Sequence, residues 1–283
     1  MSEFFADIKT QTFLQFALAT GLLASVACGV IGSFVVARRI TYIAGGIAHT
    51  VLAGLGAARY CQVTYGWQWF HPLYGAVIAA LLAAAVIGTV SLAAHQREDT
   101  IIGAVWAVGM AVGILFIFKT PGYNVDLMSY LFGNILIVSR DDLWLIALLD
   151  GFIVAVTILF YNRFLAVCFD EEFARIRGVP VERYYLLLLA MTALTVVLLV
   201  TVVGIVMVIA LLTLPAAVAG HFVKRLSHMM ILATVCTALF TLSGIVVSYG
   251  PNLPSGATTI VIAGVAYLAV MLFEWLRTFG RSS

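Results

Sequence analysis

A histidine, His49, lies within a run of small and apolar residues from Ile40 to Ala58. At four-residue spacing Gly46, Thr50 and Gly54 form one small stripe, and Gly45 precedes His49 by the same interval. Such stripes let membrane helices approach each other closely. A neutral imidazole in this setting either hydrogen-bonds a neighbouring helix or contacts a transition metal on its path.

The metal hypothesis for His49 is limited by the number of ligands nearby. A static zinc site needs three or four ligands, and this part of the sequence supplies one. We therefore expect no stably bound cofactor, only a transient contact with a passing ion. His71 stands at the expected outer boundary of the membrane, beside Pro72, where it either meets incoming cargo or is simply solvated. Asp150 falls inside a later apolar run and should face other helices or water.

The most charged part of the chain is residues 163–183. We predict a short helix there, from Glu171 to Arg177, with Asp170 as its N-cap and Gly178 as its stop. Phe169, Phe173 and Ile176 would form an apolar stripe on it. An amphipathic helix of this kind can dock into a partner's groove, although a charged loop is more simply a solvated surface. The residues that we expect to dock are Asp170, Glu171, Glu172, Phe173, Arg175, Arg177 and Gly178.

Composition places these residues in a membrane protein. The 283 residues are 63% hydrophobic and 10% charged, whereas soluble domains are about 25% charged. Segments of about 20 apolar residues predict an all-α, polytopic protein with nine membrane-spanning helices. Eight is the alternative, because residues 184–220 form one uncharged run, with Gly204 as the expected turn. The predicted spans are 12–36, 41–59, 72–94, 100–118, 143–162, 184–202, 204–222, 229–248 and 256–276.

Basic residues predict the orientation of these helices. Lys and Arg are enriched on cytoplasmic loops. With the N-terminus outside and the C-terminus inside, eleven basic residues fall on cytoplasmic segments and four on external ones. We therefore expect one transmembrane domain, residues 1–283, with segment 163–183 in the cytoplasm. An amphipathic stretch at residues 125–138 should lie on or re-enter the outer side of the membrane.

The sequence lacks the motifs that are typical of several functional classes. No G-x-x-x-x-G-K-[ST] is present, so ATP hydrolysis would belong to another subunit. Neither H-E-x-x-H nor G-x-S-x-G occurs, which argues against a protease or lipase. The spans lack the several carboxylates expected of an ion-coupled carrier. A net charge of +2 gives no reason to expect nucleic acid as a partner.

The chain resembles the permease subunits of bacterial ABC importers for zinc, manganese or iron, from about Phe13 to Phe273. Five strings carry the resemblance in order. They are A-R-R-I-T-Y-I-A-G-G-I-A-H-T-V-L-A-G (37–54), M-S-Y-L-F-G-N-I-L-I-V-S-R-D-D-L (128–143), F-D-E-E-F-A-R-I-R-G-V-P-V (169–181), V-G-I-V-M-V-I-A-L-L-T-L-P-A-A-V-A (203–219) and L-P-S-G-A-T-T-I-V (253–261).

The resemblance implies a permease homodimer in the lipid of the bacterial cytoplasmic membrane. A separate ATP-binding subunit would dock on the 171–177 helix, and an extracytoplasmic substrate-binding protein would deliver the metal. The chain itself would be no enzyme and would work by alternating access. His49 matches the family's second-helix histidine on the metal path. Family members often carry an aspartate four residues earlier, where this chain has Gly45.

Other functions stay open from the sequence. The cargo of an ABC permease can be a metal chelate or another small solute. A stand-alone secondary transporter would act without an ATPase, and a membrane scaffold would use His49 only for packing.

Overall fold

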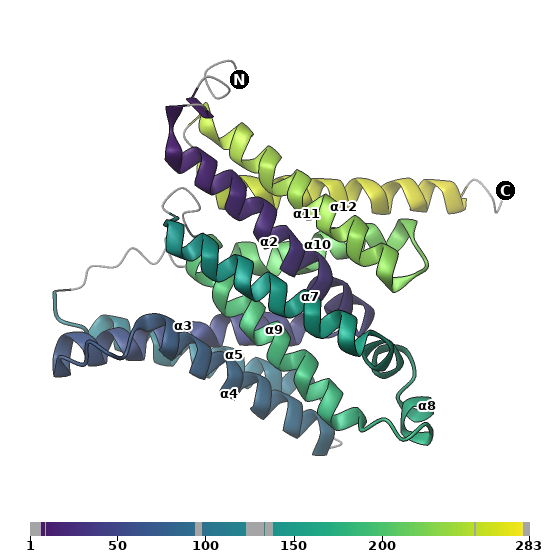
Figure 1. Cartoon of the computed structure of the whole chain (residues 1–283), viewed down its shortest axis with the longest axis horizontal. Helices are drawn as coiled ribbons and strands as arrows, with labels where there is room; N and C mark the ends of the chain where they lie inside the picture. Colours follow the sequence, from purple (N-terminus) through teal and green to yellow (C-terminus); the bar gives the residue numbers. More distant parts are fainter. Residues whose placement is uncertain are drawn as a thin grey trace. The chain divides into compact units, whose positions relative to one another are not determined.

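The computed structural model of the protein describes residues 7–8, 10–93, 98–122, 133, 138–251 and 253–279, and these residues form helices joined by short turns, with no strand among them. Figure 1 shows the helices. They are α2 (Thr12–Ala37), α3 (Thr41–Tyr65), α4 (Pro72–Ala93), α5 (Glu98–Lys119), α7 (Arg140–Phe169), α8 (Glu171–Ile176), α9 (Val181–Val203), α10 (Ile205–Phe222), α11 (Leu226–Tyr249) and α12 (Ser255–Phe279).

Nine of the described helices are long and apolar enough to cross a membrane, as predicted. The long uncharged run is divided at Gly204, which has φ +88° and donates its N–H to the carbonyl of Val200. Glycine adopts a positive φ without steric cost, so the chain can end α9 there and begin α10 at the next residue. The nine-helix prediction is confirmed over the described residues.

Several predicted spans were shorter than the helices that contain them, and the largest differences are at the ends of α3 and α7. The second predicted span ended at residue 59, but α3 continues to Tyr65 and ends at Gly66, with φ +70°. The fifth ended at residue 162, but α7 continues to Phe169, because residues 163–169 include no glycine or proline that would end the helix. The charged segment 163–183 therefore begins as a helix. The amphipathic stretch 125–138 lies outside the described residues, apart from Gly133 and Val138.

The helices group into two compact units. The first comprises residues 1–36, 134–154 and 210–283, and includes α2, α11 and α12. Within it α11 packs on α12, where Gly244 leaves room for Thr259. The second comprises residues 37–133 and 155–209. Within it α3 packs against α4, α5 and α9, and α8 contacts α9. The prediction of one domain over residues 1–283 stays a prediction.

Candidate functional site

Helix α3 packs unusually close to its neighbours because of its small residues. A Cβ placed on Gly54 would collide with the backbone of Gly75 in α4, and one on Gly46 would lie 3.0 Å from Ile102 of α5. From the other side, a Cβ on Gly109 of α5 would lie 2.7 Å from the Thr50 hydroxyl. The predicted small-residue stripe is therefore the packing face of α3. It fixes the position of His49 relative to α4 and α5.

His49 is half-buried on α3, between its own helix and α5. Its Nδ1 lies 3.0 Å from the carbonyl oxygen of Gly45. Its ring stacks on the indole of Trp106, with centroids 4.2 Å apart and an angle of 24° between the planes. Two contacts thus restrain the imidazole, one at its edge and one on its face.

These contacts determine which nitrogen can bind a ligand. A carbonyl oxygen only accepts hydrogen bonds, so Nδ1 of His49 must carry the hydrogen in its contact with Gly45. In the neutral ring Nε2 then carries the lone pair. Histidines that ligate metals typically donate their other ring N–H to a carbonyl or carboxylate in this way, which fixes the tautomer. The arrangement suits a single metal contact through Nε2.

Trp106 is a residue that the sequence did not single out. A Cβ on Gly45 would lie 3.3 Å from its Cζ3 atom, so the absence of a side chain at position 45 makes room for the indole. Tyr42 lies on the same ring, with centroids 5.7 Å apart. The Trp106 ring therefore occupies the space that a side chain at position 45 would otherwise fill.

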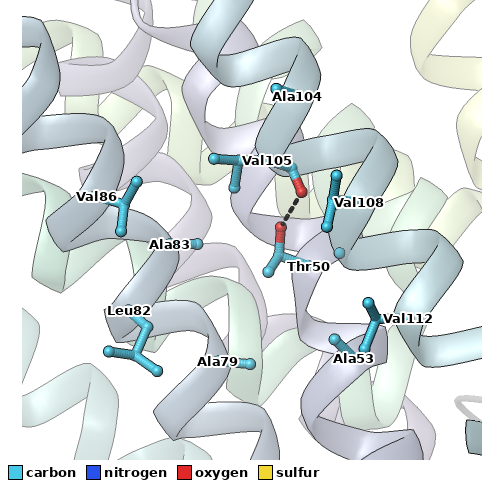
Figure 2. Close-up of a pocket in the computed structure, with 11 residues that line it drawn as sticks. Thr50, Ala53, Ala79, Leu82, Ala83, Val86, Ala104, Val105, Val108 and Val112 are labelled. Atoms are coloured by element: carbon cyan, nitrogen blue, oxygen red, sulfur yellow. Dashed lines mark hydrogen bonds between the residues drawn. The ribbon is translucent and has the colours of Figure 1, made fainter.

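Thr50 faces a different environment. Its hydroxyl lies 2.8 Å from the Gly46 carbonyl and 3.2 Å from the Val105 carbonyl, the second of which Figure 2 draws as a dashed line. It lines a groove of about 480 Å³ between α3, α4 and α5. The other lining side chains are apolar, among them Ala53, Leu82 and Val108, as Figure 2 shows. This groove offers hydrocarbon contacts and no set of metal ligands.

His71 is exposed at the start of α4. Its Nδ1 accepts the N–H of Leu73 at 3.3 Å, and its ring meets the edge of Tyr74. This hydrogen bond satisfies one of the N–H groups that every helix leaves unpaired at its beginning. The structure thus gives His71 a local role at the start of α4.

The short charged helix forms close to its predicted bounds. Asp170 accepts the N–H of Phe173 at 2.8 Å and caps α8, as predicted. The helix ends at Ile176, one residue before the predicted Arg177, and Gly178 follows with φ +74°. Ala174 faces inward, whereas Glu172, Phe173 and Ile176 are exposed. Exposed apolar side chains among charged ones make α8 a surface suited to a protein partner.

Asp150 is buried in α7, within the first unit. Neither of its carboxylate oxygens has a hydrogen bond of ordinary geometry with a described residue. Among the described residues no three His, Cys, Asp or Glu side chains gather as metal ligands. The metal hypothesis therefore rests on His49 rather than on a cluster.

Comparison with known proteins identifies relatives over almost the whole chain. Residues 10–274 match the ABC 3 transport family. A probable metal transport system membrane protein from Chlamydia trachomatis is 40% identical, over 92% of this chain and 88% of its own. The manganese transport system membrane protein MntC from Halalkalibacterium halodurans is 34% identical, over 97% and 91%. The solved structure of PsaBC from Streptococcus pneumoniae in complex with Fab is similar, with a TM-score of 0.83, 28% identity and coverage of 95% and 94%.

Proposed function

Because this chain belongs to the ABC 3 transport family, we propose that it is the permease through which an ATP-driven importer moves a divalent transition metal. Manganese is the first candidate, since a relative covering 97% of this chain is named a manganese transport protein. Zinc and iron are the alternatives. The nine apolar helices described here make it a multi-pass membrane protein, which we place in the bacterial cytoplasmic membrane.

The observation that carries the metal path is the setting of His49. Its Nδ1–H is held by the Gly45 carbonyl and its ring by Trp106, so Nε2 is presented as a ligand in a defined direction. One nitrogen binds a divalent ion weakly. A weak contact suits a pathway, because the ion must be released again within one transport cycle.

Energy and delivery come from partners. The chain has no phosphate-binding loop, so a separate cytoplasmic subunit binds and hydrolyses ATP. We propose that it docks on α8, whose exposed Phe173 and Ile176 offer apolar anchors. A substrate-binding protein delivers metal on the outer side, and two copies of this chain form the membrane part. Alternating access then follows from the movement of α8 with the ATP-binding subunit.

Uptake measurements test this function. Cells lacking the chain are complemented with the wild type or with His49→Ala, and manganese, zinc and iron are measured together under metal starvation. We expect the wild type to restore manganese, and His49→Ala to lower the uptake rate about tenfold or more, the size of effect seen when metal sites lose a partner. The ATP-binding subunit should co-purify with both proteins.

The control is His228→Ala, an exposed histidine at the start of α11. It should transport like the wild type. If the wild type restored the uptake of zinc alone or of iron alone, that metal and not manganese would be the cargo. Normal uptake by His49→Ala would show that His49 does not contact the transported metal. Equal levels of all three metals in cells with and without the chain would reject the metal-importer proposal in favour of another solute.

A further inference from the structure

Arg38 connects three helices near the turn between α2 and α3. Its Nη1 donates a hydrogen bond to the carbonyl of Val167, near the end of α7, at 2.8 Å. Its Nη2 forms an ion pair with Glu171, the first residue of α8. The guanidinium also lies over the ring of Tyr185 in α9, 5.3 Å from the centroid. All four residues belong to the second unit.

The Arg38–Glu171 ion pair is better shielded from water than the nearby ion pair between Arg175 and Glu182. The side chains of Arg38 and Glu171 are 20% and 34% exposed, whereas those of Arg175 and Glu182, which also join α8 to α9, are 54% and 49% exposed. Exposed pairs are weak because water screens them and both side chains lose freedom. A planar guanidinium that binds two oxygens and stacks on an aromatic ring is held in one geometry.

The backbone beside Arg38 is also restrained. Arg39 has φ +62°, and no other described residue except glycine has a positive φ. That conformation is costly for a side chain other than glycine and persists only where the surroundings impose it. Ile40 is buried, and α3 begins at Thr41. The connection from Arg38 to α3 is thus short and stiff.

The same helix carries His49. His49 lies eight positions after Thr41, which is about 12 Å along a helix axis. A helix of this length transmits a displacement of its first turn to the next turns. Through Arg38, a shift of α8 therefore reaches the segment that holds Gly45, His49 and their contacts with Trp106.

We propose that Arg38 is a positioning residue that couples α8 to the metal-path helix α3. Movement of α8 by the ATP-binding subunit pulls the guanidinium through Glu171, and the guanidinium carries the first turn of α3 with it. This inference rests on the proposed docking of the ATP-binding subunit on α8. It assigns Arg38 no contact with the metal.

The test uses a readout that needs no metal. The full transport complex is placed in lipid vesicles, with the native cysteines replaced by serine or alanine, and Tyr42→Cys is introduced as a probe. Tyr42 is exposed on the first turn of α3. The rate of maleimide reaction at position 42 is measured with and without ATP. In the parent protein we expect ATP to change that rate about fivefold or more, the size of typical coupling between sites.

Variants of the ion pair should remove this response. In Arg38→Gln we expect the ATP-dependent change to vanish while the ATP-binding subunit still co-purifies. Glu171→Gln should lose the same ATP-dependent change. Arg38→Lys should behave like Arg38→Gln, since it keeps the charge but cannot hold Glu171 and Val167 together. The double variant should be no worse than either single one, because both remove the same link. The matched control is Glu182→Gln, which should stay within about twofold of the parent.

Three results would overturn the proposal. They are an ATP response that persists in Arg38→Gln, a parent protein whose position 42 does not respond to ATP, and loss of the ATP-binding subunit from both single variants, which would make Arg38 a docking residue. The metal is tested separately. A complex that responds to ATP at position 42 but moves no manganese, zinc or iron would contradict the metal cargo and leave the role of Arg38 supported.

Discussion

At the scale of single residues, the orientation of the imidazole matters more than its presence. A histidine on a membrane helix can turn about two side-chain bonds. Here the Gly45 carbonyl and the Trp106 indole restrict His49 to one arrangement. Stacking of two rings is worth about 0.5–1.5 kcal/mol beyond the area it buries. Trp106 should therefore set how well His49 meets a passing ion without touching it.

The effect of Trp106 can be measured by replacing its ring. We expect Trp106→Leu to lower the rate of manganese uptake roughly twofold to tenfold, the range that corresponds to the loss of one aromatic stack. Trp106→Phe keeps a flat ring and should retain most of the rate. Uptake is measured over a range of manganese concentrations, with the amount of protein in the membrane determined for each variant.

A second tryptophan provides the control. Trp144 is exposed on α7, and Trp144→Leu removes the same ring from a position on another helix. It should leave uptake unchanged. Equal losses in Trp106→Leu and Trp144→Leu would mean that the effect belongs to general stability rather than to His49.

The sequence could predict one side of the His49 site and not the other. The four-residue spacing of Gly46, Thr50 and Gly54 is local, so it identified the packing face of α3. Trp106 lies 57 residues beyond His49 on another helix, and no local pattern connects the two. The only available signal was Gly45, a missing side chain, which indicates that something fills the space but not what does.

At the scale of the helices, close approach of backbones at small residues holds α3 against its neighbours. In lipid, apolar side chains gain little by leaving one hydrocarbon environment for another, so packing between helices supplies the stability. The Gly54–Gly75 crossing of α3 and α4 is the closest kind of such contact. A methyl group has no space there, and both partners are backbone atoms that cannot rotate away.

Two alanine substitutions test this crossing. Gly54→Ala should destabilise the protein by about 1–3 kcal/mol, because the added methyl group must push α3 and α4 apart. Gly264→Ala is the matched control, since a Cβ at that position of α12 meets no described atom within 4 Å. It should be neutral or slightly stabilising, as alanine favours a helix by about 0.5–1 kcal/mol over glycine.

The measurement is the thermal unfolding midpoint of both variants, purified in the same detergent. A lower midpoint for Gly54→Ala alone is the expected result. If both variants unfolded at the wild-type temperature, the two helices would have to be further apart than the structure places them.

Local signals also predicted α8 and the break at Gly204. Each depends on residues within a few positions of one another, such as Asp170 and the N–H of Phe173. Helix ends were predicted less well, because α3 continues past Arg59 and α7 past Arg163. Polar residues there end the apolar run but not the helix. The link from Arg38 to Glu171 crosses 133 positions and no sequence pattern indicated it.

At the scale of the whole molecule, orientation is the property on which the partner proposals depend. An ATP-binding subunit is cytoplasmic, so α8 must lie on that side of the membrane for the coupling through Arg38 to operate. The distribution of basic residues predicts this orientation, with eleven on one set of segments and four on the other. With nine spans, the two ends of the chain lie on opposite sides.

A reporter fused after Asn252 tests the orientation where eight and nine spans disagree. With nine spans and the N-terminus outside, the segment between α11 and α12 is external. A periplasmic phosphatase fused there should be active, and a cytoplasmic fluorescent protein should be dark. The same two reporters fused after Gly178 give the control, with the opposite result. A cytoplasmic signal after Asn252 together with an external one after Gly178 would show that the protein has the opposite orientation in the membrane. In that orientation α8 could not contact a cytoplasmic ATP-binding subunit.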